Sequence, residues 1–327
     1  MVQYTTTSDI PLYRQMIDHL GNALNLLDEQ GKDEVFRFLI SQQNPDGGFQ
    51  DRGGRSDLYY SLFGGLMLRA WGKEHGAWGM ERGLLKKRED ERLEMETGDT
   101  KPATRNPQPS TRSPQPVIGS ILKLRQFISG QSDLNVPGFI ERCCLVLLQK
   151  ELKTGKFSRI KALFSLGHSF WKERHSINLS YRSFVLFLTL DAALPIRGFL
   201  KMASKRMLAR TTIDVNSPCS EVAAKVFLLK MMNRDGVAEQ KLLKLLACES
   251  GGFKAFSHLQ NADMLSTAVA LFALNYSGSD LRLLKPLCFD FIQSNFAEGA
   301  FLSGDGDPTA DVEYTFYGLL ALGVLAD

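Results

Sequence analysis

The chain has 327 residues, of which 44% are hydrophobic and 23% are charged, and its formal net charge is +3. This balance is that of an ordinary globular protein, so it excludes a wholly disordered or fibrous chain. No stretch approaches the ~18 uninterrupted apolar residues of a membrane span, and the N-terminus lacks the pattern of a secretory signal, so we expect a cytoplasmic protein.

An internal repeat of about 48 residues determines the predicted fold. Its three clear copies run over 38–68, 242–274 and 291–322. Each has a short helical stretch, a Gly-Gly-Phe or Gly-Ala-Phe turn, a polar loop and an Asp that opens an apolar helix. The glycines allow positive φ where the first helix ends, and Asp is a frequent N-cap. We expect the Phe to fill the space between helices.

One segment between the first two copies differs from the rest of the chain. Residues 87–116 hold five of the twelve prolines, and their only large apolar side chains are Leu93 and Met95. Such a segment cannot bury enough surface to offset its ordering entropy, so we predict a disordered insertion. Because the repeat continues on both sides of it, we expect a single domain over 1–327.

Weaker copies of the repeat fill the middle of the chain. Residues 147–157 match the turn, 178–188 match a second helix, and 220–229 match another second helix. Few alternating β-branched runs occur, so the chain is predicted to be all-α. With the insertion removed, about 295 residues remain, enough for six units. Helical hairpins stacked in this way form an open solenoid or a closed ring.

The positive charge is concentrated between Lys150 and Arg210. This stretch has thirteen Lys and Arg residues against three acidic ones, a local charge of +10. It suits an anionic ligand or a lipid headgroup layer, or it reflects solvated helix faces, and we expect no nucleic-acid partner. Residues 195–210 form a basic amphipathic pattern, typical of peripheral membrane contact, of docking to a partner helix, or of an outer helix.

The repeated Gly-Gly-Phe turns and Asp-capped apolar helices resemble the (α/α)6 toroid that protein prenyltransferase β-subunits share with terpenoid (squalene–hopene type) cyclases. The resemblance covers nearly the whole chain except 87–116. It implies a ring of helical hairpins around a central apolar cavity, with an isoprenoid or isoprenoid diphosphate as ligand. Since a prenyltransferase β-subunit works with a helical-repeat α-subunit, the resemblance also implies such a subunit or a peptide as partner.

The first repeat resembles the prenyltransferase motif GGF-x-x-R-x-x-K…D-x-C-Y-S. Residues 47–61 read GGFQDRGGRSDLYYS, so Arg52, Arg55 and Tyr60 match the family residues that hold the diphosphate. Arg offers a planar fork of donors that suits phosphate oxygens. The alternative is that both arginines are ordinary loop residues.

The zinc site of that family is incomplete in this sequence. Its ligands are an Asp, a Cys two residues later and a late His. Asp57 matches the Asp, but Tyr59 and Tyr314 stand in the other two positions. A phenol is a poor zinc ligand beside a thiolate or an imidazole. We therefore expect no zinc and no other resident cofactor, with Mg²⁺ accompanying only a bound diphosphate.

The last repeat resembles a different motif of the superfamily. Class II cyclases carry D-x-D-D-T at the same helix start, and residues 311–315 read DVEYT, with Glu313 in place of the middle acid. Protonation of an alkene needs an acid that is held neutral in an apolar cavity. The alternative is that Asp311 caps the helix and Glu313 is a first-turn acid favoured by the helix dipole.

The leading hypothesis is a prenyltransferase-β-like or terpene-cyclase-like protein that binds an isoprenoid in a central cavity without the usual zinc site. One alternative is a non-catalytic toroid that serves as a binding module or scaffold, and another is a single-toroid cyclase that uses an acidic residue. The candidate residues form a catalytic and a substrate-binding group. They are Asp57, Asp311 and Glu313 for catalysis, and Arg52, Arg55, Tyr59, Tyr60 and Tyr314 for substrate binding.

Overall fold

The computed structural model describes seven stretches of the chain, which are 11–74, 114–131, 136, 138–154, 159–172, 179–193 and 212–326. These residues form twelve helices and four strands of two residues each, so the prediction of an all-α protein is confirmed. No helix in the described stretches is both long and apolar enough to cross a lipid bilayer.

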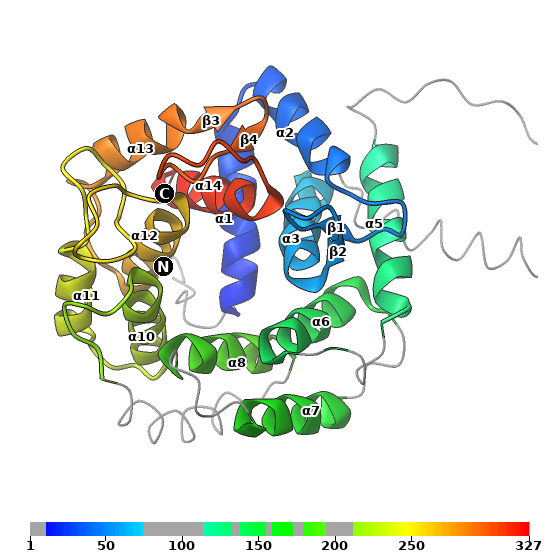
Figure 1. The fold of residues 1–327 in the computed structure, drawn as a ribbon, viewed down its shortest axis with the longest axis horizontal. Helices are drawn as coiled ribbons and strands as arrows, with labels where there is room; N and C mark the ends of the chain where they lie inside the picture. The colour runs from blue at the N-terminus through cyan, green and yellow to red at the C-terminus, as the bar shows by residue number, and fades with distance from the viewer. Residues whose placement is uncertain are drawn as a thin grey trace, which may run out of the picture.

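Of the described helices, six follow one another in contact around the centre of the molecule (Figure 1). They are α3 (Leu58–Glu74), α6 (Phe139–Leu152), α8 (Leu179–Ala193), α10 (Cys219–Met231), α12 (Met264–Ser277) and α14 (Val312–Leu325). Each contacts the next, and α14 also contacts α3, which closes the circuit. We call these six the inner helices.

Further helices lie outside this circuit (Figure 1). They are α2 (Glu29–Ser41), α5 (Pro114–Ser129), α7 (Arg159–Lys172), α11 (Val237–Lys244) and α13 (Lys285–Ser294). Two antiparallel strand pairs join outer to inner helices, namely β1 (Phe49–Gln50) with β2 (Ser56–Asp57), and β3 (Phe296–Ala297) with β4 (Ala300–Phe301). The β3–β4 turn meets α2, because a Cβ on Gly299 would lie 2.3 Å from the Glu34 carbonyl oxygen. The outer layer thus also brings the last repeat against the first.

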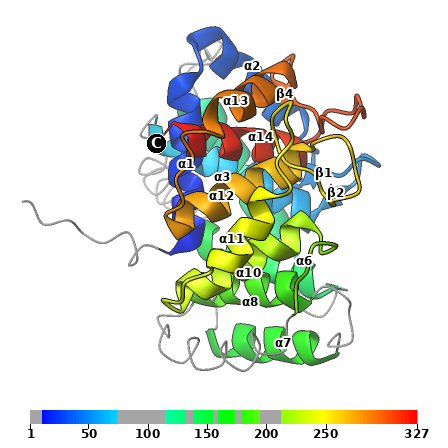
Figure 2. The ribbon, with the colours of Figure 1, turned by 90° about the vertical axis from the view of Figure 1, so that its left-hand side faces the viewer.

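The first helix, α1 (Leu12–Leu26), lies outside the repeat pattern. It packs along α14 and also contacts α3 and α8. The approach to α14 is close, since a Cβ on Gly323 would lie 1.8 Å from the carbonyl oxygen of His19. Figure 2 shows α1 on one side of the molecule and the β1–β2 pair on the other. The inner circuit therefore has two different ends, which we call the α1 end and the hairpin end.

The turn of each clear repeat has the predicted geometry. Gly47 and Gly251 have φ values of 95° and 97°, and a Cβ on either would lie within about 2 Å of a carbonyl oxygen, so glycine is required there. The three turn Phe side chains are at most 2% exposed. They are Phe49, Phe253 and Phe301. The prediction that they fill the space between helices is confirmed.

The Asp residues that open the inner helices act as predicted. Asp263 accepts a hydrogen bond from the Ser266 amide at 2.8 Å, and Asp311 accepts one from the Tyr314 amide at the same distance. A second contact of the repeat was not predicted: the turn Phe amide donates to a hydroxyl four residues after the Asp. The pairs are Phe49–Ser61 (2.9 Å), Phe253–Thr267 (2.9 Å) and Phe301–Thr315 (3.3 Å).

One match and one boundary prediction differ from the structure. Residues 147–157 were matched to the turn of the repeat, but 147–152 are the end of α6, an inner helix, and 155–157 lie outside the described residues. The physical reason is that all six residues of 143–148 are buried, which only a helix covered on every side allows. The predicted insertion at 87–116 extends too far, because α5 begins at Pro114. Proline suits a first helical turn, where its missing N–H has no partner to lose.

The remaining predictions on the linker and the basic segment lie outside the described residues. These are 87–113 and the basic pattern at 195–210.

Candidate functional site

An apolar cavity of about 110 Å³ lies at the centre of the molecule, lined by residues of all six inner helices and of α1. Many of its lining side chains are aromatic, including Tyr59, Phe63, Tyr181, Phe184, Phe227 and Tyr317. By comparison, an apolar cavity of about 150 Å³ stays dry and holds one benzene molecule. The space therefore suits a hydrocarbon group of about five or six carbons.

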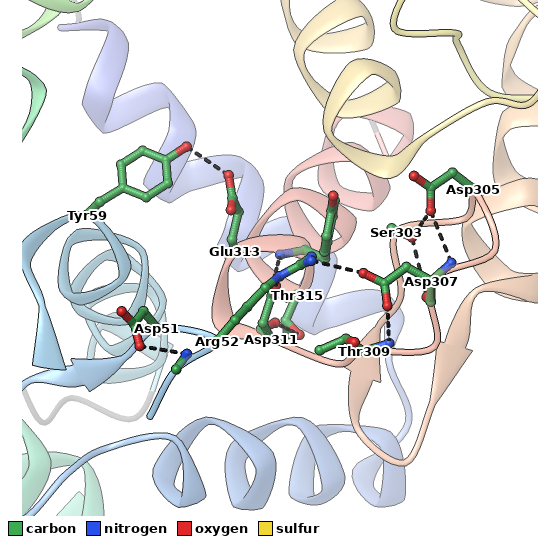
Figure 3. A network of polar contacts seen from close by, with 12 residues as sticks. Asp51, Arg52, Tyr59, Ser303, Asp305, Asp307, Thr309, Asp311, Glu313 and Thr315 are labelled. Carbon is green, nitrogen blue, oxygen red and sulfur yellow. Dashed lines mark hydrogen bonds and ion pairs between the residues drawn. The ribbon is translucent and has the colours of Figure 1, made fainter. Parts of the chain in front are cut away.

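A buried carboxyl group lies beside the cavity at the hairpin end. The Tyr59 hydroxyl, at the cavity wall, donates a hydrogen bond of 2.8 Å to Oε1 of Glu313 (Figure 3). Burial raises the pKa of the Glu313 carboxyl, and the hydrogen bond from Tyr59 partly opposes that rise. Glu313 is not itself a lining residue, so it meets the cavity through the Tyr59 hydroxyl.

Weakly acidic groups surround the Tyr59 hydroxyl. Burial raises the pKa of Tyr59, Tyr181 and Tyr317 well above that of free tyrosine, and it does the same for the thiol of Cys144. All four are therefore neutral at physiological pH. Within the described ranges, no group of three or more His, Cys, Asp or Glu side chains is placed to hold a metal ion.

Arg52 reaches across from the first repeat to the last. Its Nε donates to Oδ2 of Asp311 at 2.8 Å, and its Nη1 donates to Oδ2 of Asp307 at 2.9 Å (Figure 3). The guanidinium also lies 5.2 Å from the ring centre of Tyr314. The hydrogen bond to Asp311 raises the pKa of Arg52 further. Two carboxylates are thus already paired with the guanidinium that, by the family motif, would hold a diphosphate.

Local hydrogen bonds hold the two loops that meet at Arg52. Asp51 Oδ1 accepts from the amides of Gly53 (2.8 Å) and Arg55 (2.9 Å), which shapes the β1–β2 turn. In the facing loop, Asp307 Oδ1 accepts from the Thr309 amide at 2.9 Å. Hydrogen bonds from Thr309, with a smaller effect of Arg52, lower the pKa of Asp307. Asp307 was not among the predicted site residues.

The other predicted residues have different surroundings. Asp57 caps α3, where its Oδ1 accepts from the amides of Tyr59 (2.7 Å) and Tyr60 (3.1 Å). Burial and the nearby acidic side chains raise the pKa of Tyr60, while Arg52 lowers it. Arg55 is exposed, and its side chain forms no ion pair with any described residue. The structure therefore gathers the predicted residues at the hairpin end, with Arg55 at its rim.

The opposite wall of the cavity was not predicted. Tyr13 and Met16 of α1 line it, as does Glu151 of α6. Helix α1 carries no copy of the repeat, and residues 147–157 at the end of α6 were matched only to a turn. A signal for α6 does exist in hindsight, because the run 143–148 (CCLVLL) is apolar without a break.

The sequence matches no protein-family model, and no curated protein is similar to it. The candidate site therefore depends on its residues and their geometry.

Proposed function

We propose that this protein is an (α/α)6 toroid, similar to prenyltransferase β-subunits and terpenoid cyclases, that binds the branched hydrocarbon of an isoprenoid in its central cavity. The closed circuit of inner helices supports the toroid. The apolar, aromatic-rich cavity bounded by all of them is the observation that carries the ligand class.

The cavity volume limits which isoprenoid fits without rearrangement. About 110 Å³ accommodates about one isoprene unit, which has five carbons. A farnesyl or geranylgeranyl chain requires lining side chains to move. Five buried carbons at about 0.8 kcal/mol each give about 4 kcal/mol, which corresponds to a Kd near 1 mM for the hydrocarbon alone.

Thiol prenylation with zinc is not part of the proposal. Tyr59 and Tyr314 occupy two of the three ligand positions, and their raised pKa values keep both phenols neutral. Diphosphate capture at the hairpin end is also weakly supported. Arg52 is already held by Asp311 and Asp307, so a diphosphate there would have to displace two carboxylates.

The buried carboxyl group supports a second candidate, acid catalysis as in a single-toroid cyclase. In that reaction the Glu313 carboxyl would give its proton to an alkene carbon, leaving a carboxylate and a carbocation. Aromatic faces stabilise such a cation, and loss of a neighbouring proton to a base would end the reaction without net oxidation. The interposed Tyr59 hydroxyl argues against this candidate, because a phenol of raised pKa is too weak an acid to replace it.

The test of the proposed function is binding of 3-methyl-2-buten-1-ol, a neutral five-carbon probe, followed by ligand-observed NMR. We expect saturable binding near 1 mM in the natural protein. The variant Val269→Phe adds a ring inside the cavity and should abolish binding, because Val269 lines it. Leu283→Phe is the control, since Leu283 is 92% exposed.

If the alcohol does not bind, and farnesyl and geranylgeranyl diphosphates do not bind at tens of micromolar, the scaffold hypothesis remains. The acid-catalysis candidate has its own readout. It requires a cyclised product from a polyene, lost in Glu313→Gln.

A further inference from the structure

Two cations meet at one buried tyrosine at the α1 end of the cavity. Tyr13 lines the cavity and is 5% exposed. Its hydroxyl accepts hydrogen bonds from Arg14 Nε at 3.2 Å and from Lys150 Nζ at 3.3 Å. The Lys150 ammonium also lies 4.8 Å from the centre of the Tyr13 ring. Neither cation forms an ion pair with any residue that the structure describes.

Two carboxylates at this end are paired with other cations. Glu151, which lines the cavity, is 2.8 Å from Arg69, and Asp18 is 2.7 Å from Lys73. Both carboxylates act on Arg14 at longer range, but the Tyr13 hydroxyl contributes most to the raised pKa of its guanidinium.

Among the described residues, the Tyr13 hydroxyl is therefore the direct partner of both positive charges. Helix α1 also begins here, at Leu12, so the positive end of its dipole adds to them.

The hairpin end of the cavity is less suited to binding an anion than the α1 end. The groups around Tyr59 there are neutral phenols and a buried carboxyl, and the positive charge of Arg52 is matched by two carboxylates. A ligand with one anionic end and one apolar end would thus meet positive charge at the α1 end. This is the reverse of the orientation that the arginine motif of the first repeat implies.

We propose that the cavity binds an amphiphile whose anionic head group, a phosphate or a carboxylate, contacts Arg14, Lys150 and Tyr13 while its short branched tail fills the cavity. This inference rests on the proposed function for the tail and adds the site of the head group. Charge-assisted hydrogen bonds from Arg and Lys are the strong kind, so the head group should tighten binding.

The test compares three probes with similar branched tails: 3-methylbutyl phosphate, 4-methylpentanoate and neutral 3-methyl-1-butanol. Isothermal titration of the full chain should show at least one anionic probe binding tenfold or more tightly than the alcohol. Whichever anion binds more tightly identifies the head group. Added salt should weaken binding of the anion and leave the alcohol unchanged, because screening acts on charges.

Two variants locate the head group. Lys150→Met and Arg14→Met should each remove most of the tenfold gain while leaving alcohol binding unchanged, which also reports that the cavity is intact. Arg37→Met, at an exposed position of the outer helix α2, is the matched control and should change neither. Arg55→Met tests the opposite orientation, with the head group at the hairpin end.

Two results would overturn the inference while the proposed function survives. One is equal binding of anionic and neutral probes, and the other is loss of anion binding in Arg55→Met but not in Lys150→Met or Arg14→Met. If none of the probes binds, the proposed function fails and the inference fails with it.

Discussion

Arg52 Nε lies 2.8 Å from Asp311 Oδ2, although 259 positions separate the two residues in the chain. Asp311 is 4% exposed and also caps α14 through its other oxygen. The contact thus links the loop of the first repeat to the start of the last inner helix. It makes Arg52 a structural residue as well as a candidate ligand.

Loss of this ion pair should destabilise the fold. We predict that Arg52→Ala costs about 1–2 kcal/mol, because it leaves the buried Asp311 carboxylate without its charged partner. The cost should shrink in an Asp311→Asn background, since the neutral amide needs no cation and still caps the helix. Chemical denaturation of the four proteins of this cycle measures the coupling. Arg55→Ala, the control, should stay within about 0.5 kcal/mol of the natural protein.

Glycine is required where an inner helix meets the turn Phe. A Cβ on Gly318 would lie 2.2 Å from the Phe301 ring, so Gly318→Ala should destabilise the protein by about 1–3 kcal/mol through overpacking. The matched control is Gly21→Ala, also within a helix, where a Cβ would meet nothing within 4 Å. That change should stabilise by about 0.5–1 kcal/mol, because alanine favours the helix. Equal effects in thermal unfolding would contradict the proposed packing.

The repeated hydroxyl should contribute through its hydrogen bonds. Thr315 is fully buried, accepts from the Phe301 amide at 3.3 Å and donates to the Asp311 carbonyl at 2.8 Å. Thr315→Val keeps the shape but leaves the buried amide unpaired, at a cost of about 1–3 kcal/mol. Thr315→Ser keeps the hydroxyl and should cost less. A larger loss in the serine variant on denaturation would show that the methyl group matters more.

The buried Glu313 should make stability depend on pH. Burial raises its pKa above the ordinary 4.5, so the folded protein keeps this proton at pH values where the unfolded chain has lost it. The resulting stability is fully present below that value and is lost as pH rises through the folded pKa. Glu313→Gln cannot ionise and still accepts from Tyr59.

Relative to the natural protein, the glutamine variant should therefore gain stability as pH rises from about 4 to 8. Urea denaturation at a series of pH values measures the difference between the two proteins. A difference that does not change with pH would mean that Glu313 titrates normally in the fold.

The sequence predicted the features that the backbone of a single repeat requires. Glycines with positive φ, a buried Phe and a capping Asp are each required by the backbone of one unit, so they recur at fixed spacing. KTGKF (153–157) resembles the turn of a clear repeat, but this match did not show that α6 is an inner helix. Burial decides the layer, and burial depends on neighbours that a short motif does not contain.

The location of the candidate site was predictable from the sequence, but the contacts between its residues were not. Residues of the first and last repeats were expected together from the family motifs, and they do meet at the hairpin end. The motifs assign Arg52 and Asp311 separate roles toward a ligand, whereas the structure pairs them with each other. Arg14 had no signal, because it is an ordinary helix residue until α1 crosses the cavity. Lys150 belongs to the basic stretch that suits an anionic ligand, but the sequence did not place it beside the cavity.

The packing of α1 along α14 has a consequence for how the chain is made. The two helices are about 300 residues apart, so this is a contact of very high sequence separation, a kind that forms slowly. On the ribosome, α1 emerges about 300 residues before its partner α14 exists. Its apolar face is unprotected for that time, which is when newly made proteins aggregate or need a chaperone.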